Sequence, residues 1–242
     1  MKNLIHLLLC FILVNCEQKN NRAELFIVGT CGDNPPFEFI QNGQLVGFDM
    51  DLAKLLANEL GKKLVIKNMA FQGLLPALSS GSVDVLISGL AKTSEREQNV
   101  DFSAPYVETS MSILTNENFI LTDIGQLKGK IIGAQMGTTW HQEAKKIQSN
   151  VQDVKLRLLL NNLLLINELM LGKIDALVVE SAQVQKFKNI HYRIKSFEIA
   201  DSKSVLSIAM VKNSKLKNPL DKAILSLKNS GAIALLSKKW FN

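Results

Sequence analysis

The sequence has few cysteines, few aromatic residues and no long run of one charge. Of its 242 residues, three are cysteine and 6% are aromatic. Cys10 and Cys16 lie in an apolar N-terminal stretch, so only Cys31 remains for the folded body and a disulfide framework is excluded. No run of basic residues is longer than two, and the basic residues are not interleaved with aromatic ones. The formal charge of +6 therefore does not indicate nucleic-acid binding. It indicates a solvated surface or attraction to anionic lipid.

The N-terminus carries a segment that is set apart from the rest of the chain. After Lys2 comes "LIHLLLCFILV", an apolar run of eleven residues. A bilayer span needs about 20 residues, so the run is typical of a secretory signal peptide. It ends in "LVNC", which resembles the bacterial lipobox whose cysteine is diacylated after cleavage, although Asn15 replaces the usual small residue. We predict a signal peptide over 1–16, lipid on Cys16 and a polar tether over 17–23.

The remaining chain alternates apolar strands with amphipathic helices. Apolar residues make up 47% and charged residues 21%, as in a soluble globular protein. The pattern of strand, helix, strand, helix, strand occurs twice, which predicts doubly wound α/β lobes. The predicted strands are 24–30, 63–69, 83–90, 130–137, 155–160, 174–180 and 206–212, and the predicted helices are 48–61, 71–81, 138–149, 163–173, 181–189 and 218–241 with a break at Gly231.

No Gly/Ser-rich or Pro-rich linker separates the two copies. We therefore expect two lobes joined by strand-like crossings, with a ligand cleft between them. The predicted division assigns residues 24–112 and 206–242 to lobe 1 and residues 113–205 to lobe 2.

Three predicted strands end in residues suited to a small charged ligand. After the strand at 83–90, Ser94 and Glu97 have the spacing of a capping box, which puts Arg96 in the first helical turn. A cation is disfavoured there by about 0.3–1 kcal/mol, whereas its planar fork suits a carboxylate. A solvated surface arginine is the alternative.

The other two strand ends lie in the second copy. Thr138 and Thr139 open a helix after "KIIGAQMG", with Gln142 at capping-box spacing from Thr139, and a helix N-terminus with two hydroxyls can seat an anion. Glu180 ends the strand "IDALVVE" and can hold an ammonium group. Taken singly, the threonines could be a simple helix cap and Glu180 a turn residue; together with Arg96 they predict a receptor for a zwitterion.

Over residues 24–242 the sequence resembles the family-3 periplasmic solute-binding proteins of ABC importers, the polar amino-acid binding proteins. The resemblance implies the type II periplasmic-binding-protein architecture, or Venus flytrap, of two doubly wound α/β lobes. It is carried by "PPFEF", "VGFDMDLAKLLANELG", "FQGLLPALSSGSVDVLISGLAKTSEREQNVDFSAPY", "LKGKIIGAQMGTT", "LMLGKIDALVVE" and "LKNSGAIALLSKKWF".

The resemblance also implies a role for individual residues. Arg96 would hold the ligand α-carboxylate, helped by the Ala91 amide and by Thr138 and Thr139. Glu180 stands where the family places an acid, commonly Asp, that binds the α-ammonium. The remaining implied contacts are the Gly89 carbonyl, the Ser88 hydroxyl and the ring of Phe71 over the ligand side chain.

Five positions depart from patterns frequent in the family. Asn34 stands where many members have an aromatic residue, and Cys31 stands where several basic-amino-acid binders have an aspartate. Gln135 replaces the lysine of some glutamine binders. Ala91 and Lys92 replace residues that are frequently small hydroxyl and aliphatic ones. We expect a polar or basic ligand of the arginine or glutamine class. Its side chain would contact residues from the set Asp33, Asn34, Glu38 and Gln135.

The sequence therefore predicts an amino-acid-binding component of an ABC importer, located in the periplasm or at the cell surface, monomeric, and acting by hinge closure with a membrane permease as partner. No cofactor, metal or nucleic acid is expected. An exported dehydratase of the cyclohexadienyl type, on the same fold, is the alternative, with Glu180 as general acid; His6, His141 and His191 offer no acid/base pair for it. Because the chain stops at Asn242, we do not expect a sensor module.

Overall fold

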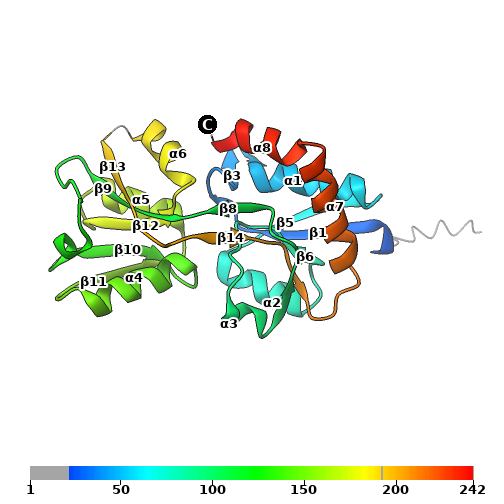
Figure 1. The fold of residues 1–242 in the computed structure, drawn as a ribbon, viewed down its shortest axis with the longest axis horizontal. Coiled ribbons are helices and arrows are strands. Elements are labelled where there is room, and N and C mark those ends of the chain that lie inside the picture. The colour runs from blue at the N-terminus through cyan, green and yellow to red at the C-terminus, as the bar shows by residue number, and fades with distance from the viewer. Residues whose placement is uncertain (1–21, 192, 242) are drawn as a thin grey trace, which may run out of the picture.

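The computed structural model describes residues 22–191 and 193–241 and has two α/β lobes lying side by side (Figure 1). Each lobe is built on one five-stranded sheet with helices packed on its faces. This arrangement confirms the predicted fold class. The predicted signal peptide, the lipidation position Cys16 and most of the tether lie outside the described residues.

The sheet of lobe 1 combines three parallel strands with two that run against their neighbours. β1 pairs in parallel with β5 and β6, and β15 pairs antiparallel with β6 and β7. Across the sheet, the strands are β5 (Lys63–Asn68), β1 (Leu25–Thr30), β6 (Val85–Leu86), β15 (Ala209–Val211) and β7 (Val100–Phe102).

Helices bury their apolar faces on the sheet of lobe 1 from two sides. One core joins the sheet to the long helices α1, α7 and α8, and a second core lies under α2. Full burial of a Leu or Phe side chain contributes about 1.5–3 kcal/mol, so these faces hold the lobe together. The helical elements are η1 (Arg22–Glu24), α1 (Phe48–Glu59), η2 (Phe71–Gly73), α2 (Leu74–Ser79), α3 (Ser94–Glu97), α7 (Lys217–Asn229) and α8 (Ala232–Phe241).

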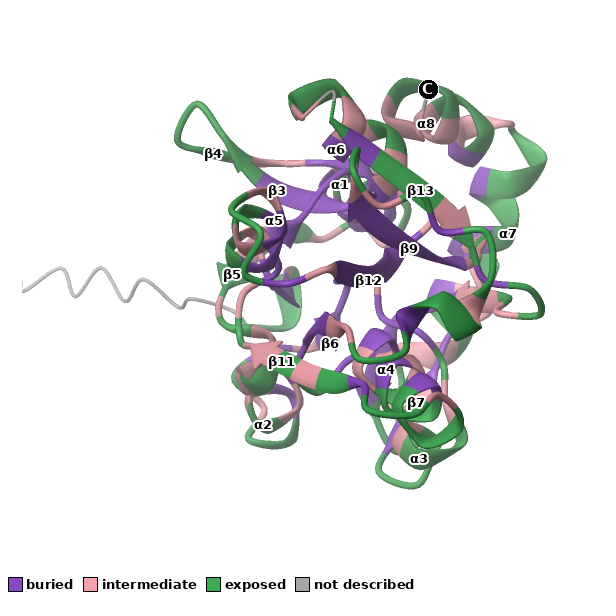
Figure 2. Cartoon of the chain, turned by 90° about the vertical axis from the view of Figure 1, so that its left-hand side faces the viewer, coloured by how far each residue is buried: buried purple, intermediate pink, exposed green. Residues whose placement is uncertain are grey.

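The sheet of lobe 2 repeats the same order of parallel and antiparallel strands. Its central strand β12 is buried at every residue, as are five of the six residues of its neighbour β9 (Figure 2). Across the sheet the strands are β11 (Lys155–Leu159), β10 (Ile131–Gln135), β12 (Ala176–Glu180), β9 (Met111–Asn116) and β13 (Ile194–Glu198). The helical elements are η3 (Ile124–Leu127), α4 (Thr139–Asn150), α5 (Asn162–Met170) and α6 (Gln183–Ile190).

Two extended segments cross between the lobes. β8 (Val107–Thr109) and β14 (Ser204–Leu206) form an antiparallel ribbon that runs from one lobe to the other (Figure 1). After the ribbon, the chain enters the second sheet at β9 and returns to the first at β15. The exact residues at which the lobes divide, predicted between 112 and 113 and between 205 and 206, remain a prediction.

Two expectations about strands were wrong. The predicted strand over 83–90 pairs only at β6, and the chain bends after it at Ser88 and Gly89, where Gly89 has a φ of +50°. The predicted strand over 206–212 is divided into β14 and β15. The turn-rich stretch after β1 also contains a small third sheet, formed by β2 (Asp33–Asn34), β3 (Glu38–Gln41) and β4 (Gln44–Val46).

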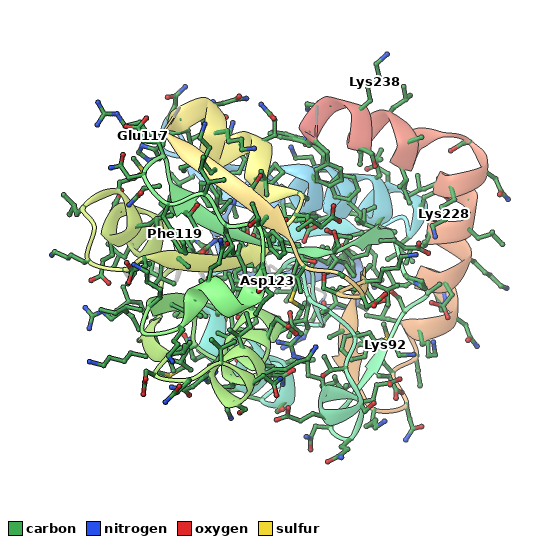
Figure 3. The ribbon with its side chains drawn as sticks, turned by 60° about the vertical axis from the view of Figure 1, so that its left-hand side comes forward. Lys92, Glu117, Phe119, Asp123, Lys228 and Lys238 are labelled. Carbon is green, nitrogen blue, oxygen red and sulfur yellow. The ribbon has the colours of Figure 1, made fainter. Side chains whose placement is uncertain are left out.

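The charged residues lie mainly on the surface. Lys228 and Lys238, for example, are exposed and point outward from α7 and α8 (Figure 3). Within residues 22–191 and 193–241, no helix combines the length and the apolar character that a membrane crossing requires.

Candidate functional site

A narrow cavity lies between the lobes and is lined by the ends of strands and the starts of helices. Its volume is about 20 Å³, roughly the room of one water molecule. Every predicted ligand-binding residue except Glu180 lines it, although their roles toward a ligand remain predictions. The lining residues are Asp33, Asn34, Glu38, Phe71, Ser88, Gly89, Ala91, Arg96, Gln135, Thr138, Thr139 and Trp140.

Arg96 enters the cavity from α3 and forms no ion pair with a carboxylate of the described residues, although the charge of its neighbour Glu95 favours the cation. Its Nη1 donates to the Ala91 carbonyl at 2.7 Å and its Nη2 to the Gly137 carbonyl in the other lobe at 3.2 Å. The guanidinium lies 5.7 Å from the centre of the Phe71 ring, a cation–π distance. Burial lowers the pKa of Arg96 to about 10. A cation that is partly desolvated and contacts only carbonyls and a ring is suited to an incoming carboxylate.

The cap of α3 differs from the predicted one by one residue. Thr93, not Ser94, is the N-cap, and its hydroxyl accepts from the Arg96 amide at 3.2 Å. Thr93 has the extended backbone that an N-cap requires. Arg96 still belongs to the first turn, so the prediction that it is poorly placed for the helix is unaffected.

The same one-residue difference occurs at α4. Thr138, not Thr139, is the N-cap and accepts from the His141 amide at 3.2 Å. Gln142 is therefore no capping partner; it donates instead to Glu95 in the other lobe at 3.0 Å. Thr139 becomes the first helical residue and lines the cavity. The positive end of this twelve-residue helix consequently faces the same space as Arg96.

Glu180 lies directly behind the cavity wall. Its Oε2 accepts from the indole nitrogen of Trp140 at 2.6 Å, and Trp140 itself lines the cavity. Its Oε1 is buried and has no hydrogen-bond partner among the described residues. Burial raises the pKa of Glu180 to about 7. An orphaned carboxylate oxygen costs free energy unless a donor reaches it, and a ligand ammonium group would supply one.

Trp140 is the site residue that sequence reasoning missed. It follows the paired threonines at the start of α4, which was its only signal. Because its partner Glu180 comes from β12, forty positions further along, the spacing of residues gives no indication of their contact.

Asp33 lines the cavity and joins the two lobes by hydrogen bonds. Its Oδ2 accepts from Gln135 Nε2 at 3.0 Å and from the Asn162 amide at 3.1 Å, both in lobe 2. Its Oδ1 accepts from the thiol of Cys31 at 3.2 Å. Asp33 is 5% exposed, and burial raises its pKa. None of its hydrogen-bond partners is a cation, so its negative charge is not balanced by the protein in this part of the site.

Asn34, Ser88 and Gly89 also line the cavity. Asn34 accepts from Gln183 of the opposite lobe at 2.8 Å. The Ser88 hydroxyl donates to Glu38 at 3.0 Å and accepts from the Cys31 amide. The Gly89 amide donates to the buried carboxylate of Asp49 at 2.6 Å.

Three larger cavities share lining residues with the site. The one of about 840 Å³ follows the crossing ribbon and shares Ala91 and Thr139, the one of about 360 Å³ shares Asp33, and the one of about 240 Å³ shares Phe71 and Arg96. Across residues 22–191 and 193–241, no group of three His, Cys, Asp or Glu side chains is arranged to hold a metal ion.

The chain matches, over residues 26–242, the model of the bacterial extracellular solute-binding proteins, family 3. It belongs to that family. Family-3 proteins are extracellular solute-binding proteins, so this chain is an exported binding component, and an amino-acid ligand and an ABC permease are the partners that the family implies.

Relatives with assigned names agree with this membership. The arginine-binding extracellular protein ArtP of Bacillus subtilis is 30% identical, with 96% of this chain and 93% of that protein covered. A probable histidine-binding protein of Campylobacter jejuni is 33% identical, with 93% and 88% covered. Among solved structures, an ancestral arginine-binding protein bound to arginine is 37% identical, with a TM-score of 0.85 over 90% of this chain and 99% of that one.

Proposed function

We propose that this family-3 protein captures a cationic or polar L-amino acid between its lobes and delivers it to a membrane permease. The observation that carries the proposal is the pairing of two opposite charges: Arg96, partly buried and hydrogen-bonded only to carbonyls, and Glu180, buried with one oxygen that lacks a donor among the described residues. A zwitterion satisfies both at once.

The two charges set the orientation of the ligand. Its α-carboxylate would be held by the guanidinium of Arg96 and by the N-terminal end of α4, where Thr139 and the helix dipole favour an anion. Its α-ammonium would donate to Glu180, with the Gly89 carbonyl and the Ser88 hydroxyl nearby.

Asp33 favours a ligand whose side chain is cationic. Its carboxylate is buried, contacts only neutral donors and lies where the site meets the 360 Å³ cavity. A guanidinium or ammonium on a long side chain could displace the Gln135 amide and pair with it. Two solved structures of ancestral arginine-binding proteins, one bound to arginine and one to glutamine, support a cationic or polar ligand.

Closure of the lobes provides the proposed mechanism. Direct hydrogen bonds already join the lobes at the cavity, from Gln72 to the Met136 carbonyl, from Gln135 to Asp33 and from Gln183 to Asn34. Since the closed cavity holds about 20 Å³, an amino acid must enter while the lobes are apart. Shifting a two-state equilibrium from 1:99 to 99:1 needs about 5.5 kcal/mol, which two or three charge-assisted bonds of about 1.5–3 kcal/mol each can supply.

Membrane attachment through Cys16, a cleaved signal peptide and a monomeric state belong to the same proposal. The N-terminal sequence supports the lipid and the signal peptide. Mass spectrometry of the membrane fraction would test the lipid: a diacylated N-terminal Cys16 is expected, and an unmodified chain starting elsewhere would contradict it.

A second candidate, a dehydratase, has one specific observation in its favour. The pKa of Glu180, raised to about 7 by burial, lets this carboxyl act as a general acid near neutral pH. Against it, the chain's named relatives are binding proteins. Incubation with prephenate or arogenate and ultraviolet detection of an aromatic product would decide: product formation that Glu180→Gln abolishes would establish the enzyme.

A thermal-shift screen against the twenty amino acids tests the binding function directly. One site at 100 times its Kd adds about 2.7 kcal/mol, which raises Tm by roughly 5–11 °C for a chain of this size. We expect the largest shifts with arginine and other cationic or polar amino acids. No shift with any amino acid would contradict the proposal.

A further inference from the structure

Two carboxyl side chains meet beneath the ligand cavity. Glu38 in β3 is 1% exposed and Asp49 at the start of α1 is fully buried. The two groups are hydrogen-bonding neighbours. Two ionised carboxylates in contact repel each other strongly in a buried setting, so one proton must be shared by the pair.

The surroundings determine which carboxyl carries the proton. Asp49 Oδ2 accepts from the Gly89 amide at 2.6 Å and from the Tyr106 hydroxyl at 3.1 Å. Asp49 is also the second residue of α1, at the positive end of the helix. Glu38 lies in a strand, and its Oε1 accepts only from the amide of Asn34 and the hydroxyl of Ser88.

The remaining oxygens of the pair complete the assignment. Glu38 Oε2 and Asp49 Oδ1 are both buried, and neither receives an N–H or O–H donor from the described residues. A proton on Oε2 that is donated to Oδ1 satisfies both atoms and leaves every other hydrogen bond in place.

We propose that Glu38 is a neutral carboxylic acid that donates a hydrogen bond to ionised Asp49, and that this shared proton holds the Ser88–Gly89 corner of the cavity in its ligand-binding position. Asp49 fixes the corner through the Gly89 amide, and Glu38 fixes it through the Ser88 hydroxyl. Glu38 is thus a positioning residue that also forms part of the cavity wall.

The titratable groups around the pair are all acidic. Burial, and then the charge of Asp49, raise the pKa of Glu38 well above its usual range, while burial raises the pKa of Asp49 to about 6. Cys31 and Tyr106 face the pair, and Glu180 acts on Tyr106 from the other lobe. No Lys or Arg forms an ion pair with Glu38 or Asp49 in the described part of the chain. The neutral form of Glu38 is therefore favoured.

The raised pKa has a definite consequence for stability. In the unfolded chain a glutamate has a pKa of about 4.3. Between that pH and the pKa of Glu38 in the folded protein, the native state therefore binds one more proton than the unfolded state does. Stability from the shared proton is complete below the unfolded pKa and is lost as pH rises through the folded pKa.

The Glu38→Gln variant separates a shared proton from a merely structural contact. The glutamine amide can donate to Asp49 as the protonated acid does, but it cannot ionise. We expect the Tm of the variant minus that of the wild type to increase from about pH 5 to about pH 9. Glu59→Gln, an exposed position on α1, is the control and should give a flat difference. A flat difference for Glu38→Gln as well would overturn the proposal.

Two further measurements guard against a variant that folds poorly. In the wild type, carbon-13 NMR of the assigned Glu38 carboxyl should show the protonated form at neutral pH; an ionised Glu38 would overturn the proposal. With L-arginine as probe, Glu38→Ala should raise Kd about tenfold more than Glu38→Gln does, and equal losses would count against the positioning role. This last measurement rests on the proposed function, whereas the Tm and NMR measurements use no ligand, so the two failures can be told apart.

Discussion

Removal of the Arg96 side chain should abolish amino-acid binding while leaving the ligand-free fold almost unchanged. Opening of the lobes frees Arg96 Nη2 from the Gly137 carbonyl, while Nη1, bonded to the Ala91 carbonyl of its own lobe, keeps a second N–H for a ligand carboxylate. Charge-assisted bonds contribute about 1.5–3 kcal/mol each. Losing two of them costs about 3–6 kcal/mol, a factor of roughly 10²–10⁴ in Kd.

The effect on the ligand-free protein should be much smaller. Arg96→Ala loses two hydrogen bonds to carbonyls, the contact with Phe71 and the attraction to Glu95, but it also removes a desolvated cation. These effects oppose each other, so we expect a change of about 1 kcal/mol or less, or roughly 2–4 °C in Tm. Isothermal titration with L-arginine and a melting curve without ligand measure the two quantities.

Arg157→Ala is the matched control for this experiment. Arg157 is an arginine on β11, outside the cavity, and its Nη2 pairs with Glu168 Oε1 at 2.8 Å. Its removal should leave Kd unchanged. If Arg96→Ala bound L-arginine with wild-type affinity, or if both arginine variants lost binding equally, the assignment of Arg96 to the ligand carboxylate would be refuted.

Three other predictions concern the remaining parts of the site. Affinity for L-arginine should fall as pH is lowered through about 7, because protonation of Glu180, whose pKa is raised to about 7, removes the acceptor of the ammonium. Glu180→Gln should bind L-arginine weakly and without this pH dependence. The same pH profile in both proteins would argue against Glu180 as the ammonium acceptor. Asp33→Asn should weaken L-arginine binding about tenfold more than L-glutamine binding, as judged by calorimetry; an equal loss would exclude Asp33 as the cation acceptor. Gly89→Ala should lower Tm by about 2–12 °C, because its Cβ would lie 2.5 Å from Asn34 Nδ2, whereas Gly43→Ala, also at positive φ but with open space around it, should cost less.

Much of the fold follows from patterns that repeat along the chain. The apolar strands and the helices with apolar faces recur in two successive copies, and the copies became two sheets with the same order of parallel and antiparallel strands. Their short pairings were harder to predict. β6 has only two paired residues, although the apolar run continues to Ile87 before the bend at Ser88 and Gly89, so no apolar pattern marks the end of the strand.

The helix caps illustrate a different limit. Thr93 is followed by Ser94, and Thr138 by Thr139, so each helix start offers two hydroxyls in succession. Either could cap by composition, and the choice depends on which residue keeps an extended backbone once the preceding strand is placed. In both helices the first of the two is the cap, one residue earlier than the spacing to Glu97 or Gln142 predicts.

Most of the cavity lining could be predicted because it lies at strand ends and helix starts within recognisable motifs. What could not be predicted depends on contacts between distant segments. The bond from Trp140 to Glu180 joins α4 to β12, and the contact between Glu38 and Asp49 joins β3 to α1. No motif in the sequence around these residues marks them as partners, because their burial and their contact arise only when the chain folds.

The whole interpretation requires that one small solute contacts both lobes at the same time. A crystal structure of the protein grown with L-arginine would test this most directly. We predict the α-carboxylate on Arg96 at the start of α4, the α-ammonium on the free oxygen of Glu180, and the side chain directed toward Asp33. Arginine bound to one lobe alone, or lying with its carboxylate away from Arg96, would contradict it.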